Sequence, residues 1–216
     1  GVAYAQEPFR VMFYNVENLF DCQHDTLKND NEFLPDAPKG WTRARYNDKL
    51  AKIAKVIVAT GVKDVPDLVG LCEVENDHCM KDLTEYSPLR EAGYRYVMTD
   101  SPDQRGIDVA LLYQRGRFKL LGKNSIRIPN EEIDRTPTRD ILHVTGQVLS
   151  GDTLDVFVCH LPSRSGGEEK SEPYRLFTAQ ILHASVDSLM NVRRHPNILI
   201  MGDFNDYPTN NSIAKV

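Results

Sequence analysis

Residues 197–208 read NILIMGDFNDYP, and this stretch indicates both a fold class and the position of a site. The apolar run from Asn197 to Met201 has the composition of a strand that is buried between layers, and it breaks at Gly202. Asp203 and Asn205 follow, two positions apart. In layered sheet folds, the loops beyond the strand ends carry the functional groups. We therefore expect a carboxylate and a carboxamide at the mouth of a buried strand.

Similar strand-like runs recur along the chain. Several are apolar on both faces and rich in β-branched residues, which is typical of strands covered on both sides. They span residues 9–16, 67–74, 94–99, 107–113, 118–128, 141–149 and 153–161. The segment SGDT joins the last two runs and predicts a hairpin, so some neighbouring strands should be antiparallel.

Two long helical patterns interrupt the strands. The first covers residues 41–60, with Gly61 as a C-terminal stop, and the second covers residues 171–192, with Ser171 as N-cap and Pro173 in the first turn. The apolar faces consist of Tyr46, Leu50, Ile53 and Ile57 in the first helix, and Thr178, Leu182, Val186 and Leu189 in the second. This order of elements predicts a layered α/β or α+β domain with mixed sheets.

The composition limits the class of protein. A chain of 216 residues that is 41% hydrophobic can bury the core of one large domain or two small ones. The net charge of −5 argues against a generally basic nucleic-acid coat, although a local basic groove stays open. No segment is long and apolar enough to predict a membrane span. We expect a monomer.

The N-terminus has the pattern of an export signal remnant. Ala3, Tyr4 and Ala5 form a small-x-small pattern before Gln6, without the hydrophobic stretch that would precede it. We therefore divide the chain into residues 1–8, a signal-peptide stub and tail, and residues 9–216, one domain. An ordinary frayed terminus is the alternative. The expected location is periplasmic or extracellular.

Four cysteines do not form a disulfide framework in a chain of this length. Cys72 and Cys159 lie inside apolar runs and are expected to be buried free thiols. Cys22 and Cys79 each follow a strand, so a pairing between them stays open. The polar segment 21–40 is long for a loop and is either functional or mobile.

Polar residues end four of the predicted strands. Their side chains are Asn15 and Glu17, Glu73, His160, and Asp203 with Asn205. Gathered at one edge, they would suit a hard divalent cation and a phosphate, because Mg²⁺ takes carboxylate oxygens and the substrate phosphate completes its shell. A second carboxylate can activate water, while amide and imidazole groups stabilise the phosphoryl oxygens.

Each of these residues also has a structural interpretation. A glutamate after a strand is commonly solvated, and a single histidine such as His160 is commonly a hydrogen-bonded structural residue. Asp203 and Asn205 are at the spacing of an Asx-turn that closes a strand.

Six segments in a fixed order resemble the endonuclease/exonuclease/phosphatase superfamily, from about residue 9 to residue 214. They are FYNVENLFD, VGLCEVEN, RGIDVALLY, TRDILHV, CHLPSRSGG and LIMGDFNDYP. The resemblance implies a four-layer α/β/β/α sandwich of two mixed sheets with the site at one edge. It also implies a Mg²⁺-dependent phosphoesterase, with Mn²⁺ as an alternative ion. The HLPSRSGG segment is most similar to exported bacterial members.

The resemblance also assigns roles. Glu73 is implied as the principal metal ligand with Asn15 close by, Asp203 as the group that activates water, and Asn205 and His160 as partners of the water and the phosphate. Arg139 is at a position where the family often carries a phosphate-facing arginine. Further candidates for the substrate or for support of the site are Glu17, Arg105, Asp108, Ser163 and Arg164. For Asp108, a structural salt bridge with an arginine is an equal alternative.

The family pattern continues with a Ser-Asp motif and an Asp-His pair, and neither follows Asn205 here. We therefore expect a domain that is incomplete at its C-terminal end. A non-catalytic module that binds phosphate or nucleic acid is the alternative to an enzyme. The substrate classes that stay open are nucleic acid, a small phosphoester and a lipid phosphoester. The apolar residues Phe33, Leu34 and Trp41 are the feature that would suit a lipid surface.

Overall fold

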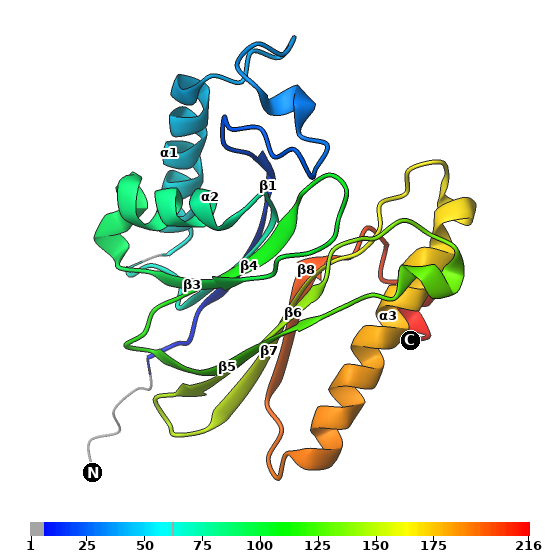
Figure 1. Cartoon of the computed structure of the whole chain (residues 1–216). Helices are drawn as coiled ribbons and strands as arrows, with labels where there is room; N and C mark the ends of the chain where they lie inside the picture. Colours follow the sequence, from blue (N-terminus) through cyan, green and yellow to red (C-terminus); the bar gives the residue numbers. More distant parts are fainter. Residues whose placement is uncertain (1–6, 62) are drawn as a thin grey trace.

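The computed structural model describes residues 7–61 and 63–216, which form two four-stranded sheets between helices (Figure 1). Sheet A contains, in spatial order, β1 (Val11–Leu19), β2 (Leu68–Val74), β4 (Asp108–Tyr113) and β3 (Arg95–Met98). Sheet B contains β5 (Phe118–Ile126), β6 (Ile141–Val148), β7 (Thr153–His160) and β8 (Ile198–Asp203). All eight predicted strands are confirmed, with ends that differ by at most three residues.

Both sheets are mixed, as predicted. β1 pairs with β2 and β7 with β8 in parallel, whereas the other neighbours are antiparallel, including the β6–β7 hairpin. The two parallel pairs matter for the site, because the carboxyl ends of parallel strands meet at the same edge of a sheet.

The helices cover the outer faces of the two sheets (Figure 1). Sheet A is covered by α1 (Arg43–Thr60), α2 (Asp77–Lys81), the π-helical turn η2 (Asp82–Tyr86) and the 3₁₀ turn η3 (Pro88–Ala92). Sheet B is covered by α3 (Glu168–Val192). Shorter turns are η1 (Asn31–Phe33), η4 (Asn130–Ile133) and α4 (Asn211–Ala214). The layers are therefore helix, sheet, sheet and helix, and the expected four-layer architecture is confirmed.

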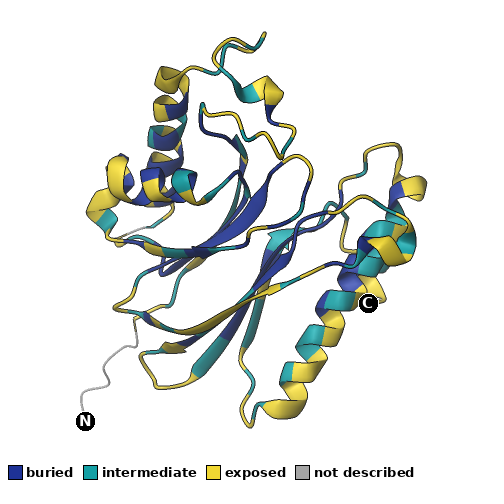
Figure 2. Ribbon diagram, in the orientation of Figure 1, coloured by how far each residue is buried: buried dark blue, intermediate teal, exposed yellow. Residues whose placement is uncertain are grey.

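Three apolar cores hold the layers together, and buried residues follow the two sheets in Figure 2. The first core lies between α1 and sheet A, the second between the sheets, and the third between sheet B and α3. Gly70 allows the sheets to approach closely, because a Cβ at this position would lie 2.4 Å from Sδ of Met201.

The helix ends differ in detail from the prediction. Gly61 does follow α1, but its φ of −78° is not left-handed. A Cβ at Gly61 would lie 1.9 Å from the carbonyl oxygen of Asp64, so the position needs glycine for space. The second helix begins at Glu168, three residues earlier than predicted, after Gly167 at φ +110°. Ser171 is therefore not the N-cap, and Pro173 lies beyond the first turn.

The four cysteines are free, and the pairing left open between Cys22 and Cys79 is not formed. Cys79 is fully buried in the core between α1 and sheet A, whereas Cys22 is partly exposed. Cys72 and Cys159 are buried, as predicted. The expected signal-peptide stub falls largely on residues 1–6, which lie outside the described residues. Within the described part, no helix has the length and hydropathy to cross a membrane.

Candidate active site

Four of the predicted site residues converge at one edge of the two sheets. Asn15 of β1 is in register with Cys72 of β2, which places it beside Glu73, and His160 of β7 is in register with Asp203 of β8. Since β1 and β2 also contact β8 of the facing sheet, both pairs of strand ends meet at the same place. Strand pairing and the packing of the two sheets therefore bring together Asn15, Glu73, His160 and Asp203.

The Asn15 amide lies between two carboxylates. Its Nδ2 donates to Oδ2 of Asp203 at 3.1 Å and to Oε1 of Glu73 at 3.4 Å. Its Oδ1 accepts the backbone N–H of Glu17 at 2.8 Å, which fixes the orientation of the amide. Asn15 thus holds the two carboxylates toward one point. The assignment of Asn15 as a metal ligand stays a prediction.

Three candidate residues of the site have a left-handed backbone, and one of them is Glu17 with φ +53°. Glu73 has φ +63° at a register shift between β2 and its neighbours, and Asn205 has φ +52°. Residues other than glycine rarely adopt this conformation, and such positions cluster at functional sites. The bulge interrupts the alternation of the strand and turns the Glu73 side chain toward the site.

The Asx-turn considered from the sequence does form. The backbone N–H of Asn205 donates to Oδ1 of Asp203 at 3.1 Å, while Oδ2 of Asp203 accepts from Asn15. The Asn205 side chain donates to the carbonyl of Leu161 at 2.9 Å. The turn therefore orients the carboxylate, so the structural interpretation and the catalytic one are compatible.

His160 is a neutral imidazole. Its Nε2 lies 3.9 Å from Oε1 of Glu73, and within the described residues its buried Nδ1 has no hydrogen-bond partner. Burial, reinforced by the charges of Arg139 and Arg105, lowers the pKa of His160 to about 3. A neutral ring can donate one N–H to a phosphoryl oxygen without carrying charge.

Arg139 is buried close to this imidazole. One guanidinium nitrogen donates to the Leu161 carbonyl at 2.9 Å, another lies 3.6 Å from Oδ1 of Asp103, and Nε has no partner within the described residues. Burial lowers the pKa of Arg139, and the Asp103 charge opposes this effect. The unpartnered Nε is consistent with the predicted contact to an anion, which stays a prediction.

Sequence reasoning missed Asp103 and Lys49. Asp103 orients Arg139 from the loop before β4, and no local pattern reveals this long-range pairing. The Lys49 amine donates to the carbonyl of Glu17, and its pKa is lowered by burial while the Glu17 and Glu73 charges oppose this shift. Its position three residues after Tyr46 on the buried helix face was the available signal.

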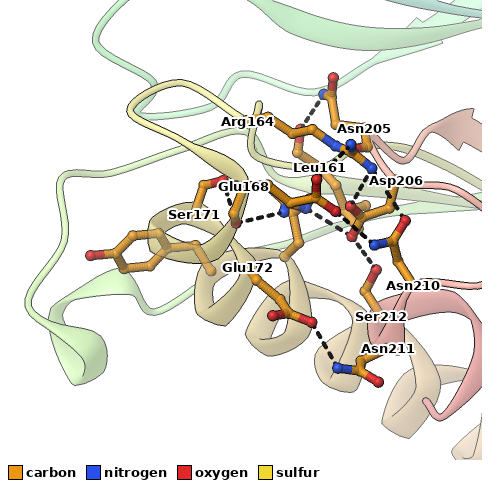
Figure 3. A network of polar contacts seen from close by, with 12 residues as sticks. Leu161, Arg164, Glu168, Ser171, Glu172, Asn205, Asp206, Asn210, Asn211 and Ser212 are labelled. Carbon is orange, nitrogen blue, oxygen red and sulfur yellow. Dashed lines mark hydrogen bonds and ion pairs between the residues drawn. The ribbon is translucent and has the colours of Figure 1, made fainter.

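Arg164 takes part in a polar network that fixes the loop after β8 (Figure 3). Its guanidinium donates to the carbonyl of Asn205 at 2.9 Å and lies 3.2 Å from Asp206 and from Glu168. Most of its donors are thus engaged within the protein. Ser163 is exposed, and its carbonyl accepts from Arg175 at 3.4 Å. The phosphate-binding roles of Arg164 and Ser163 stay predictions.

The remaining candidates lie around the cluster. Asp108 accepts hydrogen bonds from Ser101 and Thr99, and among the described residues it forms neither the alternative salt bridge with an arginine nor a hydrogen bond to the cluster. Burial raises the pKa of Asp108 to about 6. Arg105 donates to the Asn18 side chain at 2.7 Å. Glu17 supports Asn15 through its backbone N–H.

A family model described as Endonuclease/Exonuclease/phosphatase family matches residues 10–216. The chain belongs to this family. Its members are phosphoester hydrolases, so the chain has the fold of a phosphoesterase. No curated protein sequence matches it at a significant level.

Solved structures agree on the fold. The human Nocturnin catalytic domain with bound sulfate matches with a TM-score of 0.67 and 23% identity over 96% of this chain. A mannosyl-6-phosphatase from Bacteroides thetaiotaomicron matches with a TM-score of 0.62 and 19% identity over 95% of this chain. ANGEL2, a 2′,3′-cyclic phosphatase in complex with adenosine-2′,3′-vanadate, matches with a TM-score of 0.68 and 21% identity over 95% of this chain. The chain spans 68%, 68% and 56% of these three proteins, respectively.

Proposed function

We propose that this chain carries the metal-binding and water-activating part of a Mg²⁺-dependent phosphoesterase active site. The observation that carries the proposal is the convergence of Glu73 and Asp203 on the amide of Asn15, at 3.4 and 3.1 Å, from strands of two different sheets. Two carboxylates that are held together in this way, next to a neutral imidazole, suit a hard cation and a phosphate.

Each residue has a distinct role in the proposed reaction. Asp203 would accept the proton of the attacking water, while the Asn205 backbone N–H holds its Oδ1 and the Asn15 amide holds its Oδ2. His160 would donate a hydrogen bond to a phosphoryl oxygen. Arg139 would add positive charge behind this imidazole. General-base catalysis of this kind contributes roughly 10²- to 10⁴-fold.

The oxygen ligands fit Mg²⁺, with Mn²⁺ as the alternative ion. Glu73 would hold the ion, with Asn15 beside it. When bound, Mg²⁺ would neutralise the charge of the phosphate and stabilise the negative charge on the leaving oxygen. The role of the protein is to fix the carboxylates: the backbone bulge turns Glu73 inward, and the Glu17 N–H holds the amide of Asn15.

Two features bear on the class of substrate. Two of the apolar residues that would suit a lipid surface instead make contacts within the protein. The ring centroids of Phe33 and Phe20 lie 4.1 Å apart, and the Trp41 indole donates to the Phe20 carbonyl. The net charge of −5 favours a ligand with few phosphates over a long polyanion. A small phosphoester is therefore the substrate class that we favour.

The test is hydrolysis of a bis-aryl phosphodiester with Mg²⁺, comparing the parent with Asp203→Asn. Asp187→Asn is the matched control, because this α3 carboxylate is 62% exposed and takes no part in the cluster. We expect activity that EDTA abolishes, that Asp203→Asn lowers by about 10²-fold or more, and that Asp187→Asn leaves unchanged. Rates across salt concentrations separate a small substrate from nucleic acid, whose hydrolysis should fall steeply with salt.

A parent with no activity above that of Asp203→Asn would contradict catalysis by this chain. It would favour the alternative, a module that binds phosphate without turnover. A parent rate that resists EDTA would contradict the role of the metal.

A further inference from the structure

A second group of metal-ligating side chains lies where β1 and β2 end, and it shares no residue with the active-site cluster. It consists of Asp21 after β1, Glu75 after β2 and Cys79 in α2. One ligand atom from each lies within 4.8 Å of the other two, and all three residues are buried. Nothing in the proposed phosphoesterase reaction uses this group.

Strand pairing and a helix cap build this group. The backbone N–H of Glu75 donates to the carbonyl of Leu19 at 3.0 Å, and the N–H of Asp21 donates to Oε2 of Glu75 at 2.8 Å. Asn76 is the N-cap of α2: its side chain accepts the N–H of Cys79 at 2.9 Å and donates to Asp21 at 3.1 Å. Backbone and side-chain hydrogen bonds therefore hold the three residues next to one another.

One carboxylate oxygen of the group receives no hydrogen bond from the described residues. Glu75 is only 8% exposed, and its Oε2 receives the Asp21 N–H and lies 3.9 Å from the Cys79 thiol. Across residues 7–61 and 63–216, Oε1 of Glu75 receives no hydrogen bond from a protein group. Because Glu75 also lines a cavity, this oxygen is open to a ligand.

The two carboxylates of the group line a cavity of about 620 Å³, and Cys79 lies behind them in the core. The cavity wall includes Glu75 and Asp21 and the imidazoles of His78 and His24, and no lysine or arginine of the described chain lines it. Nδ1 of His78 lies 3.1 Å from Oδ2 of Asp21. A cation could therefore reach the carboxylates without displacing a resident positive charge.

We propose that Asp21, Glu75 and Cys79, with His78 at the rim, bind one divalent transition-metal ion, with Zn²⁺ as the best match. A thiolate with carboxylate and imidazole ligands suits Zn²⁺, whereas Mg²⁺ takes oxygen ligands. The ion would join the segment after β1 to α2. Binding would convert the Cys79 thiol to a thiolate, with the proton released to solvent.

The test is a titration of the chelator-treated protein with Co²⁺ and then Zn²⁺. Both titrations use the Asp203→Asn variant, because Cys72, His160 and Asp203 form the other group of side chains that could hold a metal ion among the described residues. We expect one equivalent of Co²⁺ to produce a thiolate-to-cobalt charge-transfer band, which Zn²⁺ then removes. The band should disappear in Cys79→Ser and persist in Cys72→Ser, the matched buried-thiol control.

His78→Ala provides a second test that does not disturb the core, because this side chain is 40% exposed. It should weaken Zn²⁺ binding by about 10- to 100-fold, the usual effect of a residue that orients or supplements the ligands. Absence of a band, a band that persists in Cys79→Ser, or Zn²⁺ binding unchanged by His78→Ala would each overturn the proposal. These readouts do not depend on phosphoesterase activity.

Discussion

Arg175 and Asp206 form an ion pair that is completely shielded from solvent. Nε of Arg175 lies 2.8 Å from Oδ2 of Asp206, and both side chains have no exposed surface. Burial by itself would raise the pKa of Asp206, but contacts with Ser212, Arg175 and Arg164 bring it below its usual value. The pair joins α3 to the loop directly after Asn205, so it supports the active site as well as the fold.

We predict that Arg175→Met destabilises the protein strongly. Removal of one partner of a buried pair costs about 3–5 kcal/mol, because the other charge stays buried without compensation. Arg164 still lies 3.2 Å from Asp206, which places the expected cost near the lower limit, at about 3 kcal/mol. For a chain of this length, that corresponds to a fall in Tm of roughly 6–12 °C.

The assay is urea denaturation followed by circular dichroism, with Arg175→Met, Asp206→Asn and the double variant. Because both single changes break the same pair, the double variant should lose less stability than the sum, by about 1–3 kcal/mol. The control is Arg194→Met, an exposed arginine near the end of α3, whose effect should stay within about 0.5 kcal/mol. A cost below about 1 kcal/mol for Arg175→Met, or strict additivity, would refute the reasoning.

Two further predictions concern His160 and Gly202. With a chelator present, the free energy of unfolding should fall less steeply below pH 7 in His160→Gln than in the parent. The reason is that the pKa of His160 is about 3 in the folded state and 6.5 in the free state, so acid protonates the unfolded parent first and stabilises it. The free energy of unfolding of the parent, measured by urea denaturation, should therefore fall by about 2 kcal/mol between pH 7 and pH 5 because of His160. An equal pH dependence of this free energy in parent and variant would contradict the low pKa of His160. Gly202→Ala should cost about 1–3 kcal/mol, because its Cβ would lie 2.2 Å from the Cys159 carbonyl oxygen. Gly122→Ala, whose Cβ meets nothing within 4 Å, is the matched control, and equal melting temperatures for the two variants would count against the steric argument.

Local patterns in the sequence predict the strands, the long helices and the polar residues that follow the strand ends. Apolar runs and helical periodicity are local signals, so eight strands, two long helices and the residues Glu73, His160 and Asp203 at strand ends followed directly. The predicted start of the second long helix was wrong, because the Ser171 hydroxyl donates to the Gly167 carbonyl within the first turn and does not cap the helix.

The way in which these strand ends meet depends on the packing of distant segments. The bulge that turns Glu73 inward, the amide of Asn15 between two carboxylates and the Asp103–Arg139 pair depend on strands and loops far apart in the sequence. The group around Glu75 has the same origin: Asp21 and Glu75 are neighbours because β1 and β2 are paired. Sequence patterns show whether a segment favours a helix or a strand and which of its residues favour burial. The site, however, forms only when segments that are far apart in the sequence pair and pack, and local patterns do not specify this pairing.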